Sequence, residues 1–106
     1  MTEGLDRLFA TITARKDTDP AQSYTAKLLV AGVEKCAKKF GEEATETVIA
    51  AIQRDKAELA KESADVLYHL AVLWAASGIT PEDVYAVLKA RESMSGLEEK
   101  ASRKGG

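Results

Sequence analysis

The sequence contains little of what several common functional sites require. Its 106 residues include one cysteine, Cys36, so an internal disulfide and a cysteine-rich zinc site are both excluded. Its one histidine, His69, cannot supply the two Glu-x-x-His pairs of a di-iron carboxylate bundle. The chain has neither a glycine-rich phosphate loop nor a nucleophile elbow. Of the metal sites considered, one built from carboxylate oxygens on helices remains compatible with this sequence.

Charge and hydropathy argue against two further classes of protein. The formal net charge is −2, whereas affinity for nucleic-acid phosphates comes mainly from a surplus of Lys and Arg, so we expect no nucleic-acid binding. The segment 66–81 is uncharged when His69 is neutral, but it is too short and too broken by Ser77-Gly78 to span a membrane. The first residues form no apolar signal segment. Cys36 suits a small core position in a reducing compartment, so we expect a cytoplasmic protein.

Hydrophobic spacing predicts an all-α fold. The chain is 45% apolar and 30% charged, which is typical of one soluble globular domain, here spanning residues 1–106. Apolar residues recur every three or four positions, and no alternating strand pattern occurs. Helices are expected over about 5–16, 24–29, 33–52, 55–77 and 81–92. These make a bundle of four to five helices, followed by a polar tail over 97–106 that composition predicts to be flexible.

Several residues mark the expected helix ends. Ser23 is a candidate cap for the second helix, and Gly32 marks a bend before the third. The segment 80–83 combines a capping threonine, proline at the first helical position and acids in the first turn. Gly41 lies inside the third helix, where glycine costs about 1 kcal/mol relative to alanine. It predicts a close backbone approach or a local break beside the neighbouring acids.

Two acidic pairs dominate the pattern. Glu43 and Glu46 lie on the third expected helix, and Glu62 and Asp65 lie on the fourth. Residues three apart on a helix project from the same side, so two such helices packed together would gather four carboxylates. Mg²⁺ favours such oxygen ligands, commonly together with substrate phosphates. The sequence therefore predicts a Mg²⁺ site for phosphate chemistry, with solvated acids on a helical interaction module as the alternative.

Basic and aromatic residues accompany the acids. Lysines precede the first acidic pair at positions 35, 38 and 39, and the C-terminus is rich in Lys and Arg; both clusters suit a metal-bound polyphosphate, although solvated surface charge is equally consistent. His69 is interpreted as a hydrogen-bonded structural residue, with contact to substrate or metal as the alternative. Tyr24 and Tyr68 are interpreted as half-buried helix residues, with stacking on a base as the alternative.

These acids and their surroundings resemble the MazG-like all-α nucleoside triphosphate pyrophosphatases, whose signature is E-x-x-E followed by E-x-x-D on neighbouring helices. Within that superfamily the chain most resembles the phosphoribosyl-ATP pyrophosphatases. The resemblance rests on the segments 23–29, 39–46, 62–70 and 95–103. The acidic signature identifies only the superfamily, whereas Ser-Tyr-Thr-Ala-Lys and Glu-Lys-Ala-Ser-Arg point to this family. Ser93 departs from the glycine expected in many relatives.

The resemblance implies a nucleotide-binding hydrolase of L-histidine biosynthesis. It would convert phosphoribosyl-ATP to phosphoribosyl-AMP and pyrophosphate by Mg²⁺-assisted attack of water on the triphosphate. The implied metal ligands are Glu43, Glu46, Glu62 and Asp65, and the implied catalytic residues are Glu42, Glu43 and Glu46, with Glu42 either beside the ligands or acting as the base. Phosphate contacts are expected from Lys27, Lys39, Lys100 and Arg103.

Partners and an alternative activity complete the expectations. A chain this short exposes much of its surface, so we expect a homodimer to complete its core. Some relatives are fused to the phosphoribosyl-AMP cyclohydrolase of the following step, and here we expect that enzyme to be a separate protein. The competing activity is house-cleaning hydrolysis of other nucleoside triphosphates with the same acids.

Overall fold

The structure, a computed structural model, describes residues 2–92 of the chain. Within these residues it contains helices and no strands, which confirms the predicted all-α fold. The helices are α1 (Thr2–Ala14), α2 (Tyr24–Ala31), α3 (Val33–Ile52), α4 (Lys56–Ser77) and α5 (Pro81–Arg91). The expected tail over 97–106 lies outside the described residues. No helix in the described part of the chain has the length and apolar character needed to cross a membrane.

Side-chain caps begin three of the helices where the sequence predicts. Ser23 Oγ accepts a hydrogen bond from the Ala26 N–H at 3.1 Å and begins α2. Before α5, Thr80 Oγ1 accepts from the Asp83 N–H at 3.3 Å, while the Asp83 carboxylate accepts from the Thr80 N–H at 2.9 Å. Asp55 caps α4 in the same way as Ser23 caps α2. Each cap satisfies amide groups that have no partner within the helix.

Two glycines turn the chain, and a third does not. Gly32 joins α2 to α3 with φ of 98°, and Gly78 ends α4 with φ of 77°, both in the region that favours glycine. Gly41 instead lies within the uninterrupted α3, and no atom lies within 4 Å of the position that a Cβ would occupy there. The predicted close approach or break at Gly41 is therefore wrong, because this side of α3 faces open space.

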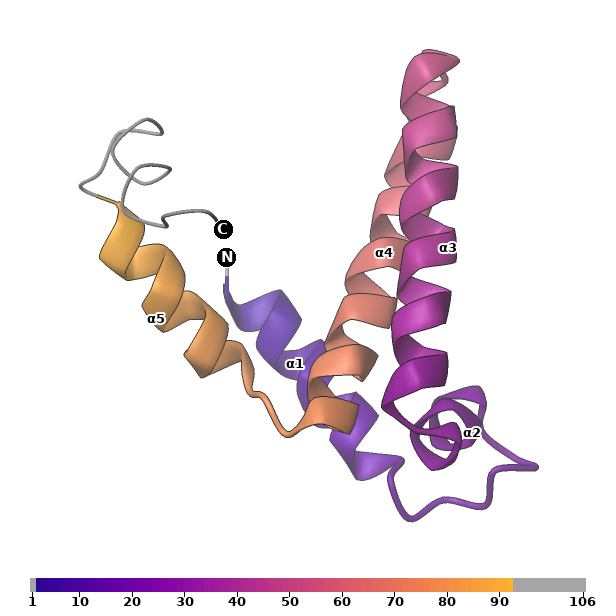
Figure 1. Cartoon of the computed structure of the whole chain (residues 1–106), viewed down its shortest axis with the longest axis vertical. Helices are drawn as coiled ribbons and strands as arrows, with labels where there is room; N and C mark the ends of the chain where they lie inside the picture. The colour runs from indigo at the N-terminus through magenta and orange to yellow at the C-terminus, as the bar shows by residue number, and fades with distance from the viewer. Residues whose placement is uncertain (1, 93–106) are drawn as a thin grey trace.

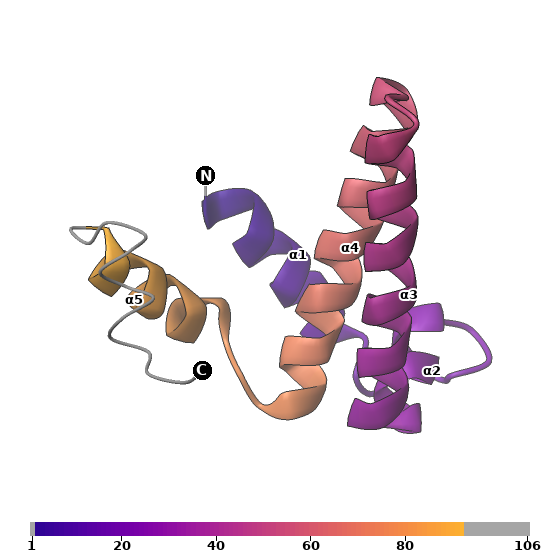
Figure 2. The ribbon, with the colours of Figure 1, turned by 45° about the horizontal axis from the view of Figure 1, so that its top comes forward.

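Helices α3 and α4 form a long antiparallel hairpin, and α1 and α2 pack against one end of it (Figures 1 and 2). The core lies at that end and consists of Ile12, Leu28, Cys36, Ala71 and Val72. Cys36 is buried, as predicted, and its Sγ donates to the Leu28 carbonyl at 3.3 Å. The core thus joins α1, α2, the beginning of α3 and the end of α4.

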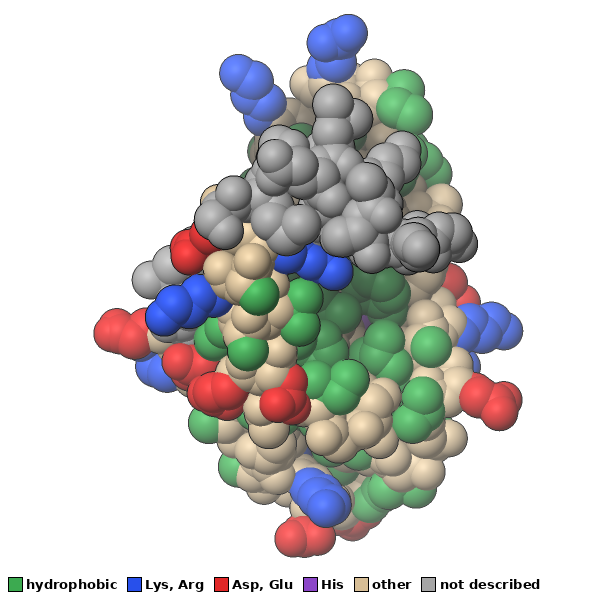
Figure 3. All heavy atoms as spheres, turned by 60° about the vertical axis from the view of Figure 1, so that its left-hand side comes forward, with side chains coloured by type: hydrophobic (Ala, Val, Ile, Leu, Met, Phe, Trp, Pro, Cys, Tyr) green, Lys and Arg blue, Asp and Glu red, His purple; other side chains and the backbone are tan. Residues whose placement is uncertain are grey.

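The opposite end of the hairpin and α5 have much less cover. Helix α5 leaves the hairpin and meets α1, where Tyr85 Oη donates to Asp6 at 3.4 Å. Hydrophobic side chains gather between α5 and the rest of the molecule (Figure 3). On α3, Val48 is 56% exposed and Ile52 is 74% exposed, although both belong to the apolar stripe of that helix. The described chain therefore leaves part of its apolar surface in solvent.

Candidate active site

The antiparallel hairpin brings acids from α3 and α4 to one place. Glu43, Glu62 and Asp65 each offer a carboxylate oxygen, and these three oxygens lie within 4.8 Å of one another. Thr47 stands beside them and links the helices, since its Oγ1 lies 2.8 Å from the Glu43 carbonyl and 3.2 Å from that of Glu62. The hydroxyl of Thr47 can therefore donate to a backbone carbonyl on either helix. This arrangement can hold a metal ion through three hard oxygen ligands.

Glu62 is the most buried of these acids. Its side chain belongs to a residue only 8% exposed, and its Oε1 has no hydrogen-bond partner among the described residues. A hydrogen bond with Glu58 raises the pKa of Glu62 to about 7, with further contributions from burial and from the charges of Glu46, Glu58 and Asp65. A buried carboxylate oxygen without a partner, such as Oε1 of Glu62, is costly, so it favours either a proton or a cation.

Glu43 and Glu46 occupy different positions around Glu62. Burial raises the pKa of Glu43, and the nearby charges of Glu46 and Asp65 raise it further. Glu46 lies outside the group of three oxygens within 4.8 Å, and instead lines a neighbouring cavity together with Glu62. The structure thus brings three of the four predicted ligands together and places the fourth beside Glu62.

Glu42, one residue before Glu43, forms an ion pair. Lys39 Nζ donates to Glu42 Oε1 at 3.0 Å across one turn of α3. The hydrogen bond from Lys39 and its charge lower the pKa of Glu42, and the same hydrogen bond raises the pKa of Lys39. A carboxylate held in this way is a weaker base than a free one.

Lysines gather on the other side of this ion pair. Lys27 from α2 and Lys35 and Lys39 from α3 line a cavity of about 240 Å³, together with Tyr24. Among the described residues, Lys27 and Lys35 have no carboxylate within 4.0 Å. These cations therefore remain available to an anion. Lys100 and Arg103, which the sequence also predicts as phosphate contacts, lie outside the described residues.

Comparison with known proteins shows the family to which the chain belongs. The family model described as phosphoribosyl-ATP pyrophosphohydrolase matches residues 5–92. The chain belongs to the phosphoribosyl-ATP pyrophosphohydrolase family. It is 60% identical over 99 residues to a phosphoribosyl-ATP pyrophosphatase of Cereibacter sphaeroides, covering 93% of this chain and 96% of that one. A protein of the same name from Azospirillum brasilense is 58% identical over 100 residues, covering 94% and 90%.

A third relative of that name, from Parvibaculum lavamentivorans, is 61% identical over 99 residues, covering 93% of this chain and 91% of the relative. These matches run through both acidic helices. They confirm the resemblance drawn from the sequence, and they identify the chain as a hydrolase of the family that acts in histidine biosynthesis. The all-α architecture is consistent with the MazG-like superfamily.

His69 lies beside Tyr24, which lines the cavity of the lysines. It is 6% exposed, and its ring meets Tyr68 edge-on at 5.0 Å and Tyr24 at 6.1 Å between centroids. Burial lowers the pKa of His69, and the charge of Lys39 lowers it further. Its Nδ1 has no hydrogen-bond partner among the described residues, so the buried ring lacks the predicted hydrogen bond at this nitrogen.

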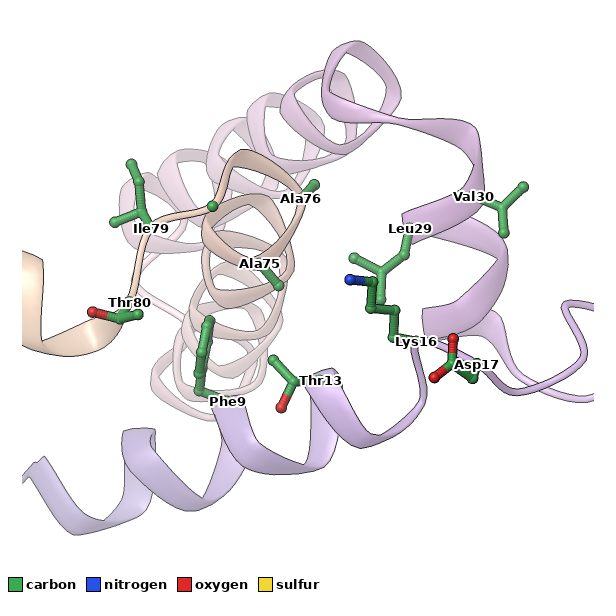
Figure 4. A pocket seen from close by; sticks show the side chains of 11 residues that line it. Phe9, Thr13, Lys16, Asp17, Leu29, Val30, Ala75, Ala76, Ile79 and Thr80 are labelled. Atoms are coloured by element: carbon green, nitrogen blue, oxygen red, sulfur yellow. The ribbon is translucent and has the colours of Figure 1, made fainter.

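A cavity larger than those beside the acids and the lysines lies elsewhere in the described chain. It has a volume of about 570 Å³ and is bounded by α1, α2 and the end of α4 (Figure 4). Apolar side chains such as Phe9 and Leu29 line it, and none of the predicted site residues reaches it. Cavity size alone would therefore misplace the active site.

Sequence reasoning missed two residues beside the acids. The sequence pattern does not point to Thr47, because a threonine in a helix gives no sign that it will reach a second helix. Glu58 was overlooked although it lies four residues before Glu62, a spacing that places both on one side of α4. Its position on the α3–α4 cavity shows that the acidic surface extends beyond the two signature pairs.

Proposed function

We propose that the protein hydrolyses phosphoribosyl-ATP to phosphoribosyl-AMP and pyrophosphate, the second step of L-histidine biosynthesis, with Mg²⁺ as its cofactor. One observation carries the proposal. One carboxylate oxygen from each of Glu43, Glu62 and Asp65 lies within 4.8 Å of the other two, and Oε1 of Glu62 is buried without a hydrogen-bond partner among the described residues. Negative charges held so close together favour the binding of a cation. The name of the family and of its relatives indicates phosphoribosyl-ATP as the substrate.

The donor set fits Mg²⁺, which takes oxygen ligands and binds together with substrate phosphates. We propose Glu43, Glu46, Glu62 and Asp65 as its ligands. When bound, Mg²⁺ neutralises phosphate charge and polarises the phosphorus that water attacks. The carboxylates contribute by holding the ion at the hairpin and by orienting the triphosphate against it, with Thr47 keeping the two helices in register.

Glu42 and Lys39 provide a coupled acid–base pair in this proposal. A phosphate of the substrate would compete with Glu42 for the Lys39 ammonium. Because the hydrogen bond from Lys39 is the largest cause of the lowered pKa of Glu42, its loss would return that pKa toward the ordinary value. Glu42 would then accept the proton of the attacking water more readily. Lys27, Lys100 and Arg103 are proposed as further phosphate contacts.

Pyrophosphate release from phosphoribosyl-ATP tests the proposal, with ATP and dUTP as parallel substrates. We expect Mg²⁺-dependent turnover that strongly prefers phosphoribosyl-ATP. Glu43→Gln should lower kcat/KM by about 100-fold or more, the scale associated with loss of a principal electrostatic group. Glu34→Gln is the matched control, because it removes an exposed acid from the first turn of the same helix. It should leave turnover unchanged.

Other results of this assay would support a different function or a different set of site residues. A preference for ATP or dUTP would instead indicate a house-cleaning nucleoside triphosphate pyrophosphatase that uses the same acids. Absence of turnover on all three substrates, with intact folding by circular dichroism, would favour a non-catalytic interaction module. Full activity of Glu43→Gln would remove Glu43 from the site.

We further propose that the protein is a homodimer. Apolar side chains stay in solvent along α3 and α5, and a second copy is a partner with matching apolar faces. The exposed residues that support this are Val48, Ile49, Ile52, Val87 and Leu88. Sedimentation equilibrium should give twice the mass of the chain. Val48→Glu should yield monomers, whereas Ala10→Glu on the exposed side of α1 should not, and a monomeric parent protein would contradict the proposal.

The last proposals concern the domain, its cellular compartment and a partner enzyme. We propose that residues 1–106 act as one domain in the cytoplasm. The product, phosphoribosyl-AMP, is the substrate of a phosphoribosyl-AMP cyclohydrolase, and we propose a functional link to that enzyme. Fractionation of cells that express the protein tests the compartment, and coupled assays with a cyclohydrolase test the link.

A further inference from the structure

Two lysines precede the acids along one side of α3. Lys35, Lys39 and Glu43 are spaced four residues apart, which places them on the same side of the helix. With a helical rise of about 1.5 Å per residue, Lys39 lies about 6 Å before Glu43, and Lys35 lies about 12 Å before it. A molecule that extends from the acids along this side of α3 therefore meets first one lysine and then the other.

The lysine-lined cavity lies at the far end of this path. Lys27 on α2 lines it together with Lys35 and Lys39, and no acidic side chain of the described residues does so. Cations that converge without an acid favour an anion between them. The volume of about 240 Å³ is below the range of about 300–1,000 Å³ that is typical of drug-sized ligands. The cavity therefore suits a small anionic group, such as a sugar phosphate, better than a whole nucleotide.

Tyr24 gives this cavity an aromatic wall that is held in place. Its ring meets that of His69 edge-on, with the centroids 6.1 Å apart. The next residue, Thr25, shares a hydrogen bond with the Tyr68 hydroxyl on α4, and Ser23 caps α2 just before the ring. Tyr24 nevertheless remains 51% exposed. An anchored, exposed aromatic ring beside cations suits a ligand that joins a ring to a phosphate.

We propose that Lys27 and Lys35 bind the monophosphate of the phosphoribosyl group, and that this contact selects phosphoribosyl-ATP over ATP. The inference rests on the proposed function and assigns a part of that substrate to this cavity. Phosphoribosyl-ATP carries a triphosphate on one ribose and a monophosphate on a second ribose, with the base between them. The two phosphate groups therefore bind at different turns of α3, the triphosphate at the acids and Lys39 and the monophosphate in the cavity. ATP has no group that reaches the cavity.

Steady-state kinetics with phosphoribosyl-ATP and ATP tests this assignment. Lys35→Gln should lower the ratio of kcat/KM for phosphoribosyl-ATP to that for ATP by about tenfold or more, the scale of one hydrogen bond to a charged group. The KM for phosphoribosyl-ATP should rise by a similar factor. Lys35→Arg keeps a cation that binds phosphate, so it should retain the selectivity.

Lys38→Gln is the matched control. Lys38 lies on the same helix, and its charge, like that of Lys35, lowers the pKa of Glu42. It does not line the cavity. The ratio of kcat/KM values should therefore stay at the parent value in Lys38→Gln. An effect of Lys35→Gln that acted through Glu42 or through net charge would appear in both variants.

Binding of ribose 5-phosphate provides a readout without turnover. This molecule has the sugar and the monophosphate but neither the base nor the triphosphate. In metal-free protein, where the acids hold no cation to attract phosphate, it should shift the NMR amide signals of α2 and the beginning of α3. Its affinity should fall by about tenfold or more in Lys35→Gln and stay the same in Lys38→Gln. Ribose itself should give no shifts, and circular dichroism checks that both variants are folded.

Three outcomes would overturn the inference: unchanged selectivity in Lys35→Gln, an equal loss of selectivity in Lys38→Gln, or ribose 5-phosphate binding that does not depend on Lys35. The binding arm also separates this inference from the proposed function. Ribose 5-phosphate binding that depends on Lys35, without turnover of phosphoribosyl-ATP by the parent protein, would support the phosphate site and reject the proposed reaction. Turnover of phosphoribosyl-ATP that is indifferent to Lys35→Gln would reject only this inference.

Discussion

The two ends of the α3–α4 hairpin are built on opposite principles. At the end covered by α1 and α2, Ile12, Leu28 and Val72 are buried and form a continuous core. From the middle of the hairpin toward its other end, Glu43, Glu62 and Asp65 converge, and Ile52 at the turn is 74% exposed. The covered end therefore stabilises the fold. The other part carries repulsion between carboxylates, which a bound cation would relieve, and exposed apolar side chains, which a second copy of the chain would cover. Stability and function are separated along one pair of helices.

The largest effect should come from the acidic end. Asp65→Asn removes the negative charge of one of the three converging carboxylates, so kcat/KM for phosphoribosyl-ATP should fall by about 100-fold or more. The unfolding midpoint of the metal-free protein should stay the same or rise, because the change lowers repulsion. Steady-state kinetics and thermal denaturation measure the two quantities. A large loss of stability with proportionate loss of activity would show that the two ends are not separate.

A matched pair of isoleucines compares the two ends directly. Ile12 is 1% exposed and Ile52 is 74% exposed. Ile12→Ala should lower the free energy of unfolding by about 3 kcal/mol through lost burial and a cavity. Ile52→Ala should change it by less than about 0.5 kcal/mol in dilute protein. Chemical denaturation at two protein concentrations measures both, and equal costs at high concentration would indicate that a second copy covers Ile52.

The pH dependence of stability should follow Glu62. Its pKa in the folded protein is about 7, above the ordinary value of 4.5, so the folded state binds this proton more tightly than the unfolded state. The resulting stabilisation is complete below pH 4.5 and is lost as pH rises through 7. The metal-free protein should therefore lose stability between about pH 5 and 8. Glu62→Gln should flatten this part of the denaturation profile.

Mg²⁺ should reverse that trend, because it competes with the proton for the same carboxylate. Its stabilising effect should be larger at pH 8 than at pH 6. Thermal denaturation with and without Mg²⁺ at both pH values measures the difference. An equal effect of Mg²⁺ at the two pH values would argue that Glu62 does not bind the ion.

The smallest effects concern two glycines near the hairpin. Gly32 has φ of 98°, so Gly32→Ala should lower the free energy of unfolding by about 1 kcal/mol or more through backbone strain. Gly41 lies in regular helix with open space around it, so Gly41→Ala should raise stability by about 0.5–1 kcal/mol. Urea denaturation measures both, and effects of the same sign would contradict the different roles assigned to the two positions.

Much of the fold could be predicted because its signals are local. Caps at Ser23 and Thr80 act on amides within three residues, and helical periodicity needs only one turn of chain to recognise. The approach of Glu43 to Glu62 was also predictable, since both acids lie beside apolar stripes that pack. The interpretation of Gly41 was wrong because nothing local tells whether a helix face meets another element or solvent.

Placement within the site depended on long-range packing. Glu46 lies beside the three converging oxygens instead of among them, and Glu58 joins it on a shared cavity. The ion pair between Lys39 and Glu42 is local, yet its relation to Lys27 on α2 depends on the turn at Gly32. The sequence predicts which residues can bind metal or phosphate, but it does not predict which of them lie close together in the folded protein.

The sequence by itself determined the helices, their caps, the two acidic pairs and the family, because these depend on neighbours along the chain and on residue identity. Only the tertiary structure decided the register of α3 against α4, the burial of Glu62 and the uncovered surface at Ile52. The physical reason is that charge repulsion, loss of solvent and metal geometry depend on distances between segments. Those distances exist only once α3 and α4 have packed against each other, as in the contact of Thr47 with the Glu62 carbonyl.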